Sequence, residues 1–269
     1  MARPMILVTG ATGNVGRHVV EQLCAVGVPV RALTRNVTAT FPDGVEVVHG
    51  DLRAPLNLNG VDAVFLMWPL HTGDALPAVL ETIESRHVVF LGSGGVRDLP
   101  MAAQAELVSE RPLWTMIRPS TFAVNALWWA KQIRAGDEVA GAHGDLAMAM
   151  LHEADIADVA VRSLLDGRTG ETYDLTGPEA LTQAEQVRVI GEVLGRPLRW
   201  VELPRVRART RLVADGLPES FVDVLLDAYA VMPRRPEVTT TVADVTGRPA
   251  RTFAEWVADH AAEFGRMAA

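Results

Sequence analysis

Three glycines near the start of the chain, Gly10, Gly13 and Gly16, follow the apolar run of residues 5–9 and precede a helical pattern. Glycine permits a sharp bend and a close approach of the backbone to a ligand, and the N-terminus of the following helix attracts anions. A G-x-x-G-x-x-G turn between a strand and a helix is therefore typical of a site that holds the pyrophosphate of a dinucleotide. The alternative is a glycine-rich turn that binds nothing.

The second apolar run ends in Thr34, Arg35 and Asn36, where an NAD-specific site places an acid to bind the ribose hydroxyls. No acid follows until Asp43. Arg35 offers a guanidinium fork suited to a 2′-phosphate, so the sequence favours NADP(H) as the cofactor. The competing interpretation makes Arg35 an ordinary surface residue.

The elements that must position these residues are predicted strands with helical patterns between most of them. Unbroken apolar runs are typical of buried parallel strands, and the first helix would bury Val15, Val19, Val20 and Leu23. The sequence therefore predicts an α/β fold with a Rossmann-type, doubly wound parallel sheet. The predicted strands are residues 5–9, 29–33, 45–48, 63–67, 87–91, 114–117 and 172–175.

After Pro178 the pattern changes to helices, of which residues 182–194 are the clearest, followed by a short strand at 199–203. The basic run 205–211 is interpreted as a solvated helix face or loop, rather than an anion site. We expect a smaller, mostly helical substrate-binding lobe over the carboxyl ends of the strands, where ligands bind in open α/β sheets. The predicted domains are a cofactor-binding domain of residues 1–122 and 151–177, and a lobe of residues 123–150 and 178–269.

Composition excludes several classes of function. With 49% hydrophobic and 22% charged residues the chain is typical of a globular protein, and its net charge of −8 disfavours nucleic acid or an anionic membrane as a partner. The single cysteine, Cys24, cannot form an internal disulfide, and no Cys/His cluster has metal-ligand spacing. No signal peptide and no run of about 18 apolar residues is present, so a cytoplasmic protein without a metal is expected.

Several motifs together resemble the NmrA-like family, an atypical branch of the short-chain dehydrogenase/reductase superfamily. The resemblance covers nearly the whole chain. Its members include quinone reductases, ketoreductases that tailor angucycline-type polyketides, and a redox sensor without catalytic activity. The motifs are GATGNVG (10–16), RALTRN (31–36), GDL (50–52), GVDAVFLMWP (60–69), HVVFLGSGGV (87–96), IRPSTFAVN (117–125), ADIADVA (154–160), YDLTGPEALT (173–182) and VTGRPARTFAEWV (245–257).

The resemblance implies a complete cofactor site. Asp51 and Leu52 would flank the adenine, residues 67–69 would line the inner ribose, Ser93 would sit beside the nicotinamide, and residues 119–122 would close that pocket. The alternative for Asp51 is that it only caps a helix. The predicted cofactor-binding residues are Gly10, Thr12, Gly13, Asn14, Val15, Gly16, Arg35, Asn36, Asp51, Leu52, Met67, Trp68, Pro69, Gly92, Ser93, Pro119 and Phe122.

The chain departs from the superfamily at its acid–base pair. Standard members use Tyr-x-x-x-Lys, in which the lysine lowers the pKa of the tyrosine so that it protonates the developing alkoxide. The only tyrosines here are Tyr173 and Tyr229, followed four residues later by Gly177 and Pro233, and the only lysine is Lys131. The pair is therefore absent, which disfavours epimerase and dehydratase chemistry.

Hydride transfer survives this loss because the cofactor carries that chemistry. A quinone that accepts hydride gives a phenolate-like anion, which water protonates. A ketone beside a phenol receives its proton from that phenol of the same substrate. We expect Ser93 to hydrogen-bond the reacting oxygen, and His71 is a second candidate acid, although it also fits an ordinary loop histidine. Phe122, Trp128 and Trp129 suggest stacking surfaces for a polycyclic aromatic ligand, or simply packing of the lobe.

The predicted function is thus NADPH-dependent reduction of a ketone or quinone carbonyl on a bulky aromatic small molecule, as in natural-product ketoreductases. Monomer and homodimer are both compatible with the sequence. The alternative function is a sensor that binds NADP(H) without turnover and acts through a protein partner.

Overall fold

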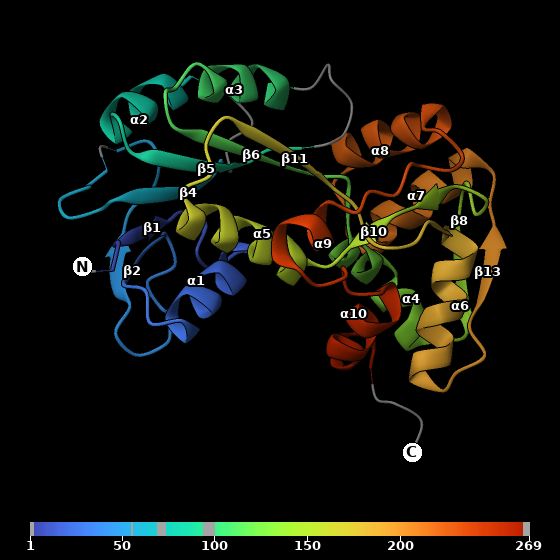
Figure 1. Cartoon of the computed structure of the whole chain (residues 1–269). Helices are drawn as coiled ribbons and strands as arrows, with labels where there is room; N and C mark the ends of the chain where they lie inside the picture. The colour runs from blue at the N-terminus through green and yellow to red at the C-terminus, as the bar shows by residue number, and fades with distance from the viewer. Residues whose placement is uncertain (1–2, 55, 69–73, 94–99, 266–269) are drawn as a thin grey trace. The chain divides into compact units, whose positions relative to one another are not determined.

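A computed structural model describes residues 3–54, 56–68, 74–93 and 100–265 of the chain (Figure 1). The chain divides into two compact units, each built from segments that alternate along the sequence. The first unit comprises Met1–Ser120, Glu153–Leu175 and Thr240–Pro249, and the second comprises Thr121–His152, Thr176–Thr239 and Ala250–Ala269.

The first unit is built on a seven-stranded parallel sheet with the order β11-β6-β5-β4-β1-β2-β3. Most of its strands are buried along their length, as their unbroken apolar runs predict, whereas β3 at one edge is mostly exposed. The Rossmann-type α/β fold expected from the sequence is therefore confirmed. The strands are β1 (Ile6–Val8), β2 (Val30–Thr34), β3 (Glu46–His49), β4 (Ala63–Met67), β5 (His87–Leu91), β6 (Trp114–Pro119) and β11 (Glu171–Leu175).

Helices cover both faces of this sheet (Figure 1). In the view of Figure 1, α2 (Leu76–Ile83) and α3 (Pro100–Ser109) lie above it, and α1 (Gly16–Ala25) and α5 (Glu153–Asp166) lie below it. The apolar face of α1 buries Val15, Val19, Val20 and Leu23 against the sheet, as expected. A short helix, α9 (Thr241–Thr246), packs on α5.

The second unit is mostly helical, with three small two-stranded sheets. Its strands pair β7 (Thr121–Phe122) with β10 (Met150–Leu151), β9 (Ala147–Met148) with β12 (Leu181–Thr182), and β8 (Glu138–Gly141) with β13 (Arg199–Glu202). Its helices are η1 (Ala123–Trp129), α4 (Ala130–Ala135), α6 (Gln183–Leu194), α7 (Arg205–Asp215), α8 (Glu219–Val231), α10 (Phe253–Asp259) and η2 (Ala261–Phe264).

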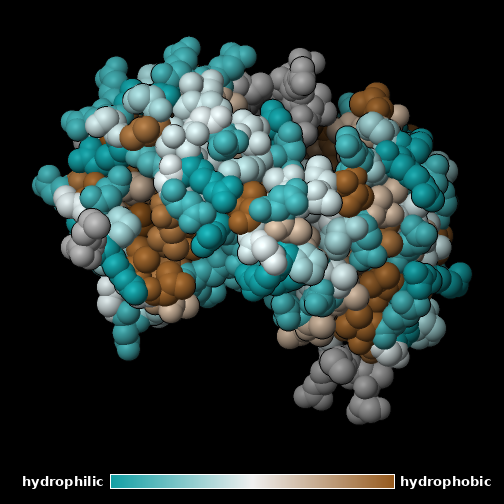
Figure 2. All heavy atoms as spheres, in the orientation of Figure 1, coloured by the Kyte–Doolittle hydropathy of each residue, from teal (hydrophilic) through white to brown (hydrophobic). Residues whose placement is uncertain are grey.

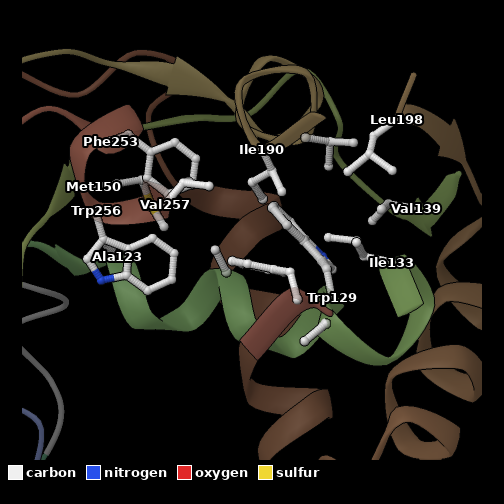
Figure 3. Packing of buried hydrophobic residues seen from close by; sticks show 14 of the residues in the cluster. Ala123, Trp129, Ile133, Val139, Met150, Ile190, Leu198, Phe253, Trp256 and Val257 are labelled. Carbon is white, nitrogen blue, oxygen red and sulfur yellow. The ribbon is translucent and has the colours of Figure 1, made fainter. Parts of the chain in front are cut away.

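Aromatic side chains fill the core of the second unit (Figure 3). Trp129 is 7% exposed and packs among Ile133 and Ile190, while Trp256 stacks on Phe253 with ring centroids 5.7 Å apart. Such burial contributes roughly 25 cal/mol per Å² of apolar surface removed from water. Trp129 is therefore a packing residue of this unit, which was one of the two interpretations left open by the sequence.

The unit boundaries differ from the expected domains by two residues at each of three junctions (121–122, 151–152 and 176–177) and by one helix. Thr240–Pro249, which contains α9, belongs to the first unit, whereas the sequence pattern had placed all of 178–269 in the lobe. The reason is that α9 buries Val242 and Val245 and packs on α5 of the first unit, a long-range contact that periodicity does not reveal.

The surface seen in Figure 2 is mainly hydrophilic, with hydrophobic residues in separate small groups. Among the helices of the described residues, none combines the length and the apolar character needed to span a bilayer.

Candidate functional site

The glycine turn connects β1 to α1 and leaves no space for a side chain at Gly10 or Gly16. Gly10 has a φ of +60°, and its carbonyl oxygen accepts a hydrogen bond of 2.8 Å from the backbone nitrogen of Gly13. A Cβ at Gly16 would lie 2.1 Å from that same oxygen, so the start of α1 packs directly on the turn. Only glycine can be accommodated where α1 comes this close to the turn. The N-terminus of α1 therefore faces the space above the turn.

The end of β4 holds the turn from the other side. The Thr9 hydroxyl donates to the Met67 carbonyl at 3.1 Å and accepts from the Met67 backbone nitrogen at 2.8 Å. A Cβ at Gly10 would lie 2.5 Å from Cε of Met67, so the thioether side chain lies against the turn. The carboxyl ends of β1 and β4 are thereby fixed side by side.

A cavity of about 180 Å³ opens at this edge of the sheet. It lies entirely within the first unit, where β1, β2 and β4 end. A groove at the carboxyl ends of parallel strands is the usual ligand site of open α/β sheets. Its lining residues are Thr9, Gly10, Thr12, Gly13, Leu33, Thr34, Arg35, Gly50, Asp51, Leu52 and Met67.

The charges around the cavity fit a phosphorylated ribose. Arg35 is exposed and, within the part of the chain that the structure describes, forms no ion pair. Asp51 uses Oδ1 to accept from the Arg53 backbone nitrogen at 2.8 Å, and its other oxygen lies 3.8 Å from the Arg53 guanidinium. Asp51 thus stabilises its own turn besides lining the cavity. Among the described residues that line the cavity, Arg35 is the one cation.

The other predicted residues of the first unit lie around the same sheet edge. Val15 is the N-cap residue of α1 and follows Asn14, and Trp68 is buried directly after β4. Gly92 follows β5, donates its backbone N–H to the Ile117 carbonyl at 2.8 Å, and precedes Ser93, which is partly buried. Asn36 lies outside this cavity and lines a neighbouring one.

The remaining four predicted residues either lie outside the described residues or do not line this cavity. Pro69 and His71 lie outside the described residues, so their roles stay predictions. Pro119 ends β6 in the first unit, whereas Phe122 lies on β7 in the second unit.

Tyr229, Lys131 and His152 of the second unit do not take over the role of the missing phenol–ammonium pair. Burial raises the pKa of Tyr229, the opposite direction to that required of an acid working near neutral pH. Lys131 donates its ammonium group to the Ala214 carbonyl. Burial lowers the pKa of His152 to about 4, so its imidazole is neutral at neutral pH.

The second unit contains a small internal cavity of about 30 Å³, which sequence reasoning did not identify. Trp129 and Trp200 face each other edge to face at 5.8 Å beside it, and Trp128 packs on Phe221 at 5.5 Å. Gln186 is buried and lines this cavity, and its Oε1 has no hydrogen-bond partner. The space suits about one water molecule rather than an aromatic ring.

Among the described residues, no group of three His, Cys, Asp or Glu side chains could hold a metal ion.

Several known proteins similar to this chain are named as reductases or oxidoreductases. The NmrA-like family model matches residues 3–90. The chain is 35% identical to the NAD(P)H azoreductase of Xenophilus azovorans, covering 97% of this chain and 99% of that protein. It is 40% identical to the (4-alkanoyl-5-oxo-2,5-dihydrofuran-3-yl)methyl phosphate reductase of Streptomyces griseus subsp. griseus, again covering 97% and 99%.

The fold is also similar to a solved structure, that of the NADPH-dependent quinone oxidoreductase of Escherichia coli in complex with NADPH. The TM-score is 0.80 with 23% sequence identity, covering 95% of this chain and 99% of that one. This similarity concerns the fold.

Proposed function

The chain belongs to the NmrA-like family, and from that premise we propose that it is an NADPH-dependent reductase that passes hydride to a conjugated acceptor. The observation that carries the proposal is the first-unit cavity, where the glycine turn faces Arg35 in the position that an NAD-specific site gives to a carboxylate. The backbone of the turn would bind the pyrophosphate, and Arg35 would bind the 2′-phosphate.

The chemistry of the acceptors named for the relatives supports this proposal. An azo bond, a quinone and an unsaturated furanone all accept hydride into a conjugated system. The resulting anion is delocalised and therefore forms without a strong proton donor, whereas the alkoxide of a simple ketone needs an acid to protonate it as it develops. Such acceptors suit a chain whose sequence has no Tyr-x-x-x-Lys pair.

Bound NADPH would supply the hydride, which carries two electrons to the acceptor. The contribution of the chain is to orient the acceptor and stabilise the negative charge that develops on it. We assign this role to Ser93, whose hydroxyl follows β5 and would hydrogen-bond the reacting oxygen or nitrogen. Water would protonate the anion, so one NADPH and one proton are consumed for each acceptor reduced.

The acceptor is proposed to be a quinone or a related conjugated group on a bulky aromatic molecule. A ketone fits as well when a neighbouring phenol of the substrate supplies the proton, as in the tailoring of polycyclic aromatic natural products. In both cases the proton comes from water or substrate rather than from a tyrosine.

The test is NADPH oxidation, followed by absorbance, with the purified chain and a panel of acceptors. The panel contains menadione, an azo dye, an unsaturated furanone, a polycyclic ketone with a neighbouring phenol, and a simple dialkyl ketone as the negative control. We expect consumption with one or more conjugated acceptors and none with the dialkyl ketone.

Two results would contradict the proposal. Tight NADPH binding without consumption across the panel would favour a redox sensor that acts through a protein partner. Rapid reduction of the dialkyl ketone would show that the chain holds a strong general acid elsewhere.

A further inference from the structure

A second cavity, of about 270 Å³, lies in the first unit beside the glycine turn. Thr12 lines both this cavity and the one described above, so the two spaces adjoin. The residue next to Arg35, Asn36, lines the second cavity, and residues 39–42 form its outer wall. Arg35 lines the first cavity and its neighbour Asn36 lines the second, so this part of the chain runs along the boundary between the two spaces.

Arg17 brings a second cation to this boundary. It lies in the first turn of α1, lines the second cavity and is only partly exposed. Its Nε lies 3.4 Å from Nε2 of His18, and within the described residues its guanidinium forms no ion pair with a carboxylate. The one carboxylate that lines the cavity, Glu21, lies 3.4 Å from His18 Nδ1 instead.

Asn36 adds a neutral donor. Its side-chain oxygen accepts from the Thr38 backbone nitrogen at 3.0 Å and from the Thr38 hydroxyl at 2.8 Å. These two bonds fix the orientation of the amide and leave its NH₂ group to donate elsewhere. Together with the Thr12 hydroxyl, the cavity thus presents donors of the kind that bind phosphate.

We infer that Arg17 is a second cation for the 2′-phosphate of the cofactor, which lies between the guanidinium groups of Arg17 and Arg35 with the Asn36 amide as a further donor. The inference rests on the proposed NADPH-dependent function and adds a specificity-determining residue to it. A phosphate monoester carries nearly two negative charges near neutral pH, so one arginine leaves part of this charge uncompensated. A second guanidinium completes the compensation.

The test uses 2′,5′-ADP and 5′-AMP as probes, because they differ only in the 2′-phosphate and need no turnover. Affinities are measured by calorimetry on the full chain. Arg17→Gln, which keeps the stem of the side chain, should bind 2′,5′-ADP about tenfold more weakly, equivalent to about 1.4 kcal/mol. Its affinity for 5′-AMP should stay the same, and Arg17→Lys should recover part of the loss.

The matched control is Arg162→Ala, which removes one positive charge from the ion pair with Asp166 on α5. It should leave both affinities unchanged, which shows that net charge alone does not produce the effect. Glu21→Gln is a second, independent variant that removes the carboxylate from the cavity, and it should tighten 2′,5′-ADP binding.

The outcomes separate this inference from the proposed function. If the unmodified chain binds 2′,5′-ADP no more tightly than 5′-AMP, the NADPH preference itself is wrong. If it prefers 2′,5′-ADP and loses this preference in Arg35→Ala but keeps it in Arg17→Gln, the role of Arg17 is wrong and the proposed function stands. Equal weakening of both probes by Arg17→Gln would also overturn the inference.

Discussion

Gly16 is the residue at which the glycine turn and α1 approach most closely. A Cβ there would lie 2.1 Å from the oxygen and 2.7 Å from the carbonyl carbon of Gly10, and these backbone atoms cannot rotate away. Gly16→Ala should therefore shift the turn, lower the free energy of unfolding by about 1–3 kcal/mol and strongly weaken NADPH binding. Urea unfolding and NADPH fluorescence titration measure the two effects.

Gly136→Ala is the control for this substitution. No heavy atom lies within 4 Å of the position its Cβ would take, and its backbone is extended, with a φ of 176°. Its free energy of unfolding should stay within about 0.5 kcal/mol of the unmodified chain, with NADPH affinity unchanged. Equal losses in the two variants would show that close packing at the turn is not the cause.

In the proposed function, the Ser93 hydroxyl hydrogen-bonds the reacting atom of the acceptor. Its hydroxyl follows β5, at the same sheet edge as the cofactor cavity. Ser93→Ala should lower kcat by about tenfold to a hundredfold, because one hydrogen bond to the developing charge is lost. NADPH affinity should change little. If kcat is unchanged in this variant, proton donation by water or substrate is sufficient, and Ser93 has no role in the mechanism.

The strands of the large sheet could be predicted closely from the sequence. The runs predicted at 63–67 and 87–91 coincide with β4 and β5, because strands buried on both faces are uniformly apolar and end at polar or glycine residues. The basic run 205–211 lies on helix α7, where Arg205 and Arg209 form ion pairs with carboxylates of α8. This agrees with its interpretation as a solvated helix face.

The short strands of the second unit could not be predicted. β7 and β10 have two residues each, and their pairing joins Thr121–Phe122 to Met150–Leu151. A two-residue strand has no measurable period, and its hydrogen-bond partner is set by tertiary packing rather than by local sequence.

The candidate site could be predicted in part, because several of its residues lie at the ends of predictable strands. Thr12, Arg35 and Asp51 follow strands or lie in the glycine motif, and the ends of parallel strands converge in space. Arg17 lies one residue beyond the motif, on a helix, and lines the second cavity, in which residues 39–42 form another wall. Nothing in the spacing of the sequence indicates that wall.

Helix α10 illustrates how one local motif stabilises an element of the second unit. The Thr252 hydroxyl accepts from the Glu255 backbone nitrogen at 3.2 Å, and the Glu255 carboxylate accepts from the Thr252 backbone nitrogen at 2.7 Å. Thr252→Ala should therefore lower the free energy of unfolding by about 1 kcal/mol, measured in urea. Thr210→Ala, at an exposed position within α7, should have a smaller effect or none.

At the scale of the whole molecule, the two units are interleaved along the chain. The first unit takes three segments of sequence, and the second takes three others. Neither unit is a continuous stretch that could be expressed by truncation, so a stability measurement on the full chain includes groups from both. A titratable group that is buried in one unit can therefore dominate the pH dependence of the stability measured on the full chain.

His152 is such a group. It is 3% exposed on the second unit, with Nε2 3.3 Å from an Asp259 carboxylate oxygen. Burial lowers its pKa from 6.5 to about 4, while Asp259 opposes this shift and the nearby charges of Arg251 and His260 reinforce it. Between these two pH values the unfolded chain binds a proton at His152 that the folded chain does not bind. Stability from this group is therefore fully present above pH 6.5 and is lost as the pH falls towards 4.

The shift corresponds to about 3 kcal/mol across that window. Burial also lowers the pKa of His87, with the same sign, so the comparison must isolate His152. In His152→Gln, the free energy of unfolding measured in urea should depend less steeply on pH between about 6.5 and 4 than in the unmodified chain, by about one bound proton. Since the glutamine changes stability equally at every pH in this range, only the slope is diagnostic. Parallel pH profiles for the two proteins would show that His152 takes up its proton equally well in the folded state.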